Sequence, residues 1–253
     1  MARAALGPDF AVHGGGLDLL FPHHENEIAQ AEGASGEPLA RLWAHNEMLE
    51  LGGKMSKSVG NIVPLRDALD RWGRDALLVF MLRTHYRSKL PLTEEGLGDA
   101  RRQVDTIRHG ARALDRALAA PGTGVDETFA EALATARRDV IDALDDDLNT
   151  PRAFAAVFTL LHAIHRSIGG PGRPAAGQLQ VVHDELAQLL GLLGLASLMA
   201  ADAIPETVLA LARRREHARL ARDFAESDRL RAEIADAGYA VLDTPDGPQV
   251  TPA

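Results

Sequence analysis

The sequence predicts an α/β segment, then an all-α helical bundle, then a small α+β unit at the carboxyl-terminal end. Short apolar runs broken by glycines and prolines dominate the first 88 residues, which is typical of mixed strands and helices. From about Leu97, apolar residues recur three and four positions apart in segments rich in Ala, Leu and Arg, which indicates helices. We therefore expect three domains, over residues 1–88, 89–200 and 201–253.

The elements follow from local patterns. Phe10 to His13 predicts a strand that ends at the following glycines, and a helix is expected to begin near Pro22, because proline suits a first helical turn. After Gly238, a short strand and a Pro-Gly turn close the terminal unit. Between these regions, the spacing predicts helices over 97–119, 126–145, 150–168, 177–195 and 205–237.

Composition excludes several classes of protein. The chain has 253 residues and no cysteine, which excludes disulfide bonds, a cysteine nucleophile and a thiolate zinc site within this sequence. The net charge of −9 argues against a protein that coats DNA, although a local basic face can still bind nucleic acid. No apolar run approaches the roughly 20 residues of a membrane span, and the first residues lack an apolar signal-peptide stretch. We expect a cytoplasmic protein that binds neither DNA nor membranes.

The first candidate site is the string HGGGLD at residues 13–18. Glycines at the end of a strand allow a base or phosphate to approach the backbone, and the carboxylate of Asp18 can accept hydrogen bonds from a ribose. A glycine-rich loop in which Asp18 only caps a helix explains this string equally well.

The second candidate site is the string FPHHENE at residues 21–27. In a helix that begins at Pro22, His23 and Glu27 lie on one face, where an imidazole and a carboxylate can share a metal ion. A plain His–Glu pair at helical spacing is the commoner explanation of such a pattern.

The third candidate is the string KMSKS at residues 54–58, preceded by two glycines. Lys54 and Lys57 on such a loop can close over a triphosphate and neutralise the charge that develops on leaving pyrophosphate. A fourth string, LRTHYRS at residues 82–88, either contacts phosphates or seats the two domains against each other, and we favour the second interpretation.

These strings resemble a known family. KMSKS is the signature loop of class I aminoacyl-tRNA synthetases, and the blocks HGGG, DL and FPHHENEIAQ closely resemble those of cysteinyl-tRNA synthetases. The strings HYRS at 85–88 and DDDLNTP at 145–151 also match, so the resemblance extends over nearly the whole chain. It implies a partial Rossmann-like class I catalytic domain, an anticodon-side helical bundle of the DALR type and a small anticodon-recognition unit.

The resemblance also implies roles for individual residues. His13, Gly15 and Asp18 fall where the family holds adenosine, with Asp18 at the ribose. Lys57 matches the lysine that contacts ATP, which is used with Mg²⁺, and Lys54 assists at the phosphates. His23 and Glu27 match two of the four ligands of the zinc ion that binds the thiolate of L-cysteine.

The partner that the resemblance implies is tRNA(Cys). A basic helix face in the terminal unit is a plausible contact for its phosphates, with a solvated helix surface as the alternative. The arginines of this face are Arg213, Arg214, Arg215, Arg219 and Arg222.

The sequence departs from the family in one region. The HIGH-type signature and both cysteine ligands of the zinc ion belong to an amino-terminal half that this sequence does not contain, so we expect weak zinc binding and impaired activity unless that half is supplied. A truncation, a split gene or a misread start codon would each produce this departure. Two further functions stay open: a non-catalytic tRNA-binding protein, and the related ligase that joins cysteine to an amino sugar.

Overall fold

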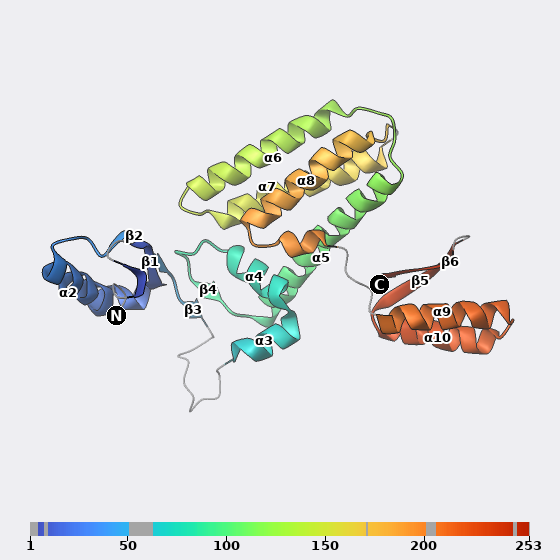
Figure 1. Cartoon of the computed structure of the whole chain (residues 1–253), viewed down its shortest axis with the longest axis horizontal. Coiled ribbons are helices and arrows are strands. Elements are labelled where there is room, and N and C mark those ends of the chain that lie inside the picture. Colours follow the sequence, from blue (N-terminus) through green and yellow to red (C-terminus); the bar gives the residue numbers. More distant parts are fainter. Residues whose placement is uncertain are drawn as a thin grey trace. The chain divides into compact units, whose positions relative to one another are not determined.

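The computed structural model describes residues 5–7, 10–50, 63–170, 172–200, 206–244 and 247–252. The chain divides into two compact units, Met1–Ala200 and Ala201–Ala253. Helices dominate both units (Figure 1). None of the described helices combines the length and the hydropathy that a membrane span requires.

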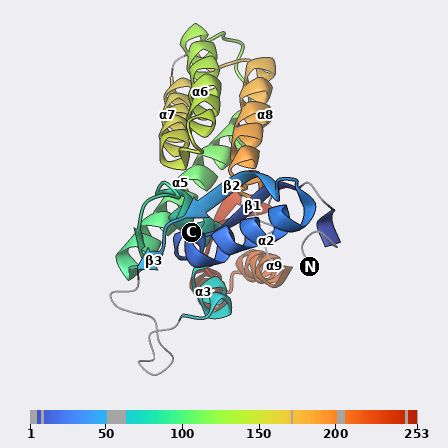
Figure 2. The ribbon, with the colours of Figure 1, turned by 90° about the vertical axis from the view of Figure 1, so that its left-hand side faces the viewer.

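The first unit begins with a strand–helix–strand motif. Strand β1 (Phe10–Gly16) pairs in parallel with β2 (Ala40–Asn46), and helix α2 (Glu25–Ser35) connects them and lies along the strand pair (Figure 2). The strand continues through the three glycines instead of ending before them, because they pair in register with residues 44–46. The helix begins at Glu25 rather than near Pro22, after two short turns, Leu17–Leu19 and Leu20–His24.

The two faces of this strand pair differ in chemistry. Side chains alternate along a strand, so His13 and its neighbour Trp43 on β2 share one face, while Val12 and its neighbour Leu42 share the other. Val12 is 55% exposed and Leu42 is 57% exposed. Parallel sheets are normally covered on both faces, so this apolar face is unusual in being open within the described part of the chain.

We expect the chain to self-associate through this apolar face. The substitution Leu42→Lys should weaken association by about tenfold, because burial of one leucine contributes roughly 1.5 to 3 kcal/mol. Sedimentation velocity at several concentrations measures the effect. Leu192→Lys, at a leucine of similar exposure in a helix elsewhere in the chain, is the control and should change nothing. Equal weakening by both substitutions would contradict this assignment.

Two short helices and a second strand pair connect this motif to the bundle. Helices α3 (Leu65–Trp72) and α4 (Arg74–Leu82) meet at Gly73, whose φ of +77° suits glycine. Strand β3 (Leu49–Glu50) pairs in parallel with β4 (Leu90–Pro91).

The helical bundle contains four long helices: α5 (Glu94–Ala119), α6 (Glu127–Asp145), α7 (Thr150–Gly169) and α8 (Ala176–Leu192). The side chains of Thr93, Asp126 and Asn149 cap the first three by accepting backbone hydrogen bonds. The largest apolar core of the described residues lies here, with Ile107, Leu160 and Leu186 among its fully buried side chains. Sequence and structure agree closely on these helices, except that α5 begins three residues earlier than predicted and α8 ends three residues earlier.

The second unit is a helical pair with a β-hairpin. Helices α9 (Glu206–Leu220) and α10 (Phe224–Asp236) pack together and against strands β5 (Tyr239–Thr244) and β6 (Gly247–Pro252). The predicted segment 205–237 is thus two helices. The chain turns at Arg222, whose φ is +62°, and Asp223 caps the second helix through its side chain.

Candidate functional site

Aromatic rings cluster on the face of the β1–β2 pair that α2 covers. The ring of His13 stacks on Trp43 with centroids 4.3 Å apart, and the ring of His24 meets His13 edge-on at 4.9 Å. Nδ1 of His24 lies 2.8 Å from Nε2 of His45, so one of these nitrogens donates a hydrogen bond to the other. Residues from two strands and from the start of a helix thereby form one cluster.

Glu27 adds a carboxylate to this cluster. One of its oxygens lies 3.4 Å from Nε2 of His13. His13, His24 and Glu27 each offer one ligand atom, and these atoms lie within 4.8 Å of one another. Burial, the largest cause, lowers the pKa of His24, and the nearby His13 lowers it further, which favours the neutral imidazole that metal ions bind.

The structure places the two adjacent histidines differently. His24 is buried in the cluster, whereas the side chain of His23 is exposed and is not part of the cluster of three ligands. Successive helical residues point about 100° apart, so only one of the two can face the strands. Glu27 follows His24 by three residues, a spacing that shares a helix face as well as the predicted spacing of four does.

Two further predicted residues lie near the carboxyl end of β1: Gly15 within the strand, and Asp18 two residues beyond it. A Cβ on Gly15 would lie 2.6 Å from Cε1 of His24, so glycine at this position makes room for that ring. A Cβ on Gly16 would clash with Oδ1 of Asp18, whose side chain is exposed. Ligands of parallel α/β sheets bind at the carboxyl ends of the strands, where Asp18 lies. The predicted phosphate contacts Lys54 and Lys57 lie outside the described residues.

The string at 82–88 contacts the bundle. The hydroxyl of Tyr86 donates to Oδ1 of Asp147 at 2.6 Å, and Nε of Arg87 donates to the other oxygen of that carboxylate, also at 2.6 Å. Asp147 lies in the loop between α6 and α7. These contacts support the interpretation that this string seats one domain against the other.

The same contacts predict a pH effect. The hydrogen bond from Arg87, followed by that from Tyr86, lowers the pKa of Asp147 from 3.8 to about 2. Because the folded-state pKa is depressed, the stabilisation should be complete above pH 4 and disappear as the pH falls toward 2. Urea unfolding measures the free energy of unfolding of the chain and of Asp147→Asn. The difference between these two free energies should be constant from pH 5 to 7 and should shrink below pH 4. A difference that persists undiminished to pH 2 would contradict this.

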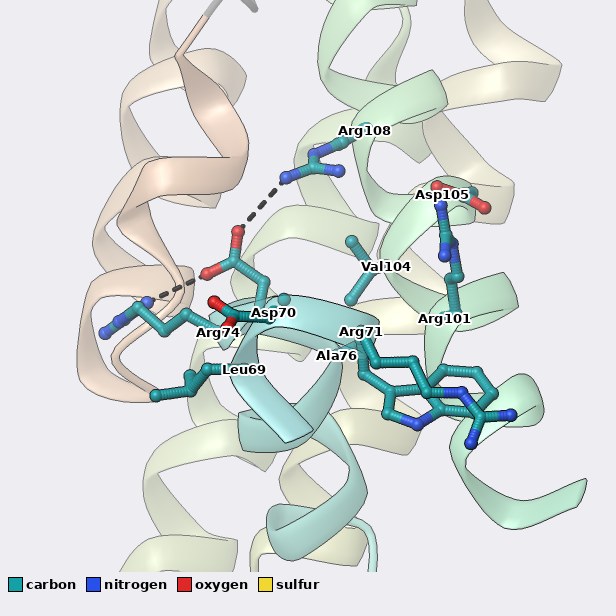
Figure 3. Close-up of a pocket in the computed structure, with 12 residues that line it drawn as sticks. Leu69, Asp70, Arg71, Arg74, Ala76, Arg101, Val104, Asp105 and Arg108 are labelled. Atoms are coloured by element: carbon teal, nitrogen blue, oxygen red, sulfur yellow. Dashed lines mark hydrogen bonds and ion pairs between the residues drawn. The ribbon is translucent and has the colours of Figure 1, made fainter. Parts of the chain in front are cut away.

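A polar pocket of about 320 Å³ lies where the junction of α3 and α4 meets α5. Nη1 of Arg74 and Nη2 of Arg108 both contact the carboxylate of Asp75, at 2.8 and 3.1 Å (Figure 3). Arginines and aspartates alternate around the pocket, so their charges largely balance. Its side chains therefore join α4 to α5 rather than create a strong field of one sign.

The five predicted arginines of the second unit have different environments. Arg215 is only 5% exposed and donates to both oxygens of Asp243, at 2.7 and 3.1 Å, so it lies inside the unit and not on an open basic face. Arg219 shares the Asp243 carboxylate, while Arg213 and Arg214 pair with Glu206 and Glu226. Arg222 is exposed and has no ion-pair partner among the described residues.

One exposed residue of this unit was not predicted from the sequence. Phe224 begins α10 directly after the turn at Arg222, and it is 65% exposed. An exposed aromatic ring two positions along the chain from an exposed arginine offers suitable groups for binding a nucleic-acid base and its phosphate. The sequence pattern predicts one helical segment over 205–237, so it does not indicate that Phe224 stands at the start of a second helix.

Comparison with family models accounts for most of the chain. A model described as the tRNA synthetases class I (C) catalytic domain matches residues 1–102, and a DALR domain model matches residues 139–197. The model of the cysteinyl-tRNA ligase anticodon binding domain matches residues 201–250. The chain belongs to the cysteinyl-tRNA synthetase family. The presence of an anticodon binding domain argues against the amino-sugar ligase.

Relatives within the family cover almost all of this chain. The cysteine–tRNA ligase of Caldicellulosiruptor saccharolyticus is 37% identical over 253 residues, which are 99% of this chain and 54% of that protein. The cysteine–tRNA ligase of Symbiobacterium thermophilum is 40% identical over 256 residues, 98% of this chain and 53% of that protein. The chain thus spans about half the length of these cysteinyl-tRNA synthetases.

Solved structures of other synthetases share the fold. The LeuRS of Agrobacterium radiobacter K84, in a ternary complex with tRNA, superimposes with a TM-score of 0.57 at 18% identity over 76% of this chain and 28% of that one. The methionyl-tRNA synthetase of Mycobacterium tuberculosis gives a TM-score of 0.50 at 20% identity over 74% of this chain and 40% of that one. At these identities the likeness shows the fold alone.

Proposed function

We propose that this chain carries part of a cysteine–tRNA ligase. The whole enzyme would activate L-cysteine with ATP to give cysteinyl-adenylate and pyrophosphate, and would then transfer cysteine to the terminal adenosine of tRNA(Cys). The observation that carries the proposal is the succession of catalytic, DALR and cysteinyl-tRNA anticodon binding domains in one chain. About half of each matched relative lies outside the aligned region, so the proposed activity needs a complementary half.

In this proposal, the nucleotide binds at the carboxyl ends of β1 and β2. His13 and Gly15 lie along β1 on the face that α2 covers, and Asp18 follows that strand with an exposed carboxylate able to accept from a ribose. The ammonium groups of Lys54 and Lys57 would bind the phosphates of ATP, together with Mg²⁺, and stabilise the charge on the departing pyrophosphate.

The cluster beneath α2 fits a zinc ion. Two imidazoles and a carboxylate are a donor set that catalytic zinc sites use with one position left open. When bound, zinc would hold the thiolate of L-cysteine and so discriminate it from serine. The resemblance assigns the site to His23 and Glu27, and the geometry brings together His13, His24 and Glu27. Glu27 is the ligand on which both arguments agree.

The second unit would bind tRNA through Arg222 and Phe224. Binding of tRNA(Cys) should weaken as salt rises, because phosphate contacts release counterions. Phe224→Ala should lower the affinity by about 5- to 100-fold through lost stacking, and Arg222→Ala should reduce the salt slope by about one unit. Filter binding at several salt concentrations measures both effects. Leu242→Ala, at an exposed residue of β5, is the control.

A tRNA-binding protein without catalysis is the second candidate, because the chain spans only half of its relatives. Cysteine-dependent exchange of labelled pyrophosphate into ATP separates the two. Exchange by the chain with a complementary half supports the ligase, whereas tRNA binding without any exchange supports the binding protein.

A further inference from the structure

Tyr86 makes one hydrogen bond through its side chain and another through its backbone. Its hydroxyl donates to Asp147 in the loop between α6 and α7, and its backbone carbonyl accepts from the amide of Glu47 at 2.7 Å. Asp147 belongs to the helical bundle, whereas Glu47 directly follows β2. One side chain and its own backbone therefore connect the bundle to the strand pair that carries the histidine cluster.

The bundle holds Asp147 firmly toward Tyr86. The φ angles of Asp147 and Leu148 are +54° and +53°, a left-handed conformation that few residues adopt without support. The amide of Asn149 donates to the carbonyl of Ala143 at 2.8 Å, which closes the loop. The carboxylate accepts from both Nε and Nη2 of Arg87, in addition to Tyr86.

The connection continues into the candidate site. His45 lies two residues before Glu47, and its ring nitrogen contacts His24 at 2.8 Å. Trp43 shares a strand face with His45 and stacks on His13. The amides of Leu90 and Leu92 also donate to the carbonyls of Met48 and Glu50. Backbone hydrogen bonds therefore join the segment that follows Tyr86 to the segment that follows Glu47.

We propose that Asp147 is a positioning residue, through which the helical bundle sets the carboxyl end of β2 and the cluster of His13, His24 and Trp43 by way of Tyr86. For catalysis this inference rests on the proposed function, because the bundle is the tRNA side of such a ligase. The structural part of the inference does not depend on that function. A ligand that binds to the bundle would then affect the geometry of the site through the short series of hydrogen bonds from Asp147 to Tyr86 and Glu47.

Trp43 provides a direct readout. The chain contains two tryptophans, Trp43 and Trp72, so Trp72→Phe leaves only the residue within the cluster. In that background, Asp147→Asn removes the charge and keeps a residue that tolerates a positive φ, while Tyr86→Phe removes only the hydroxyl. Asp146→Asn is the matched control, because this neighbouring aspartate contacts Arg152 and not Tyr86.

Acrylamide quenching of Trp43 fluorescence tests the proposal without tRNA, ATP or metal. Asp147→Asn and Tyr86→Phe should each raise the quenching constant at least about 1.5-fold, and the double variant should equal either single one, as coupled residues do. Asp146→Asn should leave it unchanged. If circular dichroism shows that Asp147→Asn does not fold, the quenching constant of Tyr86→Phe alone tests the proposal.

Two results would overturn the proposal. Quenching that stays unchanged in Tyr86→Phe and Asp147→Asn, even with a lower melting temperature, would show that the contact only stabilises the fold. An equal rise in Asp146→Asn would show general loosening of the loop. Failure of the proposed ligase function would leave this measurement unaffected, so the two failures are distinguishable.

Discussion

Lys57→Ala should slow cysteinyl-adenylate formation by about 30- to 10³-fold in the chain supplied with a complementary amino-terminal half. One group aimed at developing charge contributes roughly 2 to 4 kcal/mol to the transition state and much less to the ground state. Cysteine affinity should therefore change little. Pre-steady-state release of pyrophosphate is the measurement.

Two further variants sharpen this prediction. Lys57→Arg should restore the rate only in part, because a planar guanidinium does not replace a compact ammonium. Lys89→Ala is the matched control, since Lys89 is exposed and pairs with Glu50 at 2.9 Å. An unchanged rate in Lys57→Ala would show that Lys57 of the KMSKS string does not take part in adenylate formation.

Glu27→Gln should weaken zinc binding by more than about tenfold, because it removes the anionic ligand while keeping the shape of the side chain. Competition with a chromogenic chelator measures the affinity. Glu25→Gln, at an exposed glutamate in the same helical turn, is the control and should bind zinc as the unaltered chain does.

The second zinc ligand is then assigned by His23→Ala and His24→Ala. Loss of zinc in His24→Ala alone supports the observed cluster, and loss in His23→Ala alone supports the family assignment, which requires a local rearrangement of the turn before α2. Zinc affinity that survives Glu27→Gln would contradict both assignments.

The sequence predicts the helical bundle well because its signals are local. The boundaries of α5, α6 and α7 follow from apolar spacing and from caps such as Asp126 and Asn149, each within a few residues of the groups it stabilises. The family was also identifiable from short strings, and the family models confirm it.

The remaining features depend on residues that are far apart in the chain. Trp43 and His45 join the site only through the register of β2 on β1, which no local pattern specifies. Tyr86 and Asp147 are 61 positions apart. Arg215 resembles its exposed neighbours in sequence, yet the β-hairpin that brings Asp243 buries it. Burial and pairing of this kind follow from tertiary packing, not from periodicity.

We infer that this chain provides the carboxyl-terminal catalytic and tRNA-binding parts of a cysteine–tRNA ligase. The most direct test adds the amino-terminal half of the Symbiobacterium thermophilum relative, fused or in trans, and measures charging of tRNA(Cys) with labelled cysteine. We expect charging by the combined halves, little by either half alone, and none with serine in place of cysteine. No charging by a folded combination that binds tRNA(Cys), or equal charging with serine, would contradict the claim.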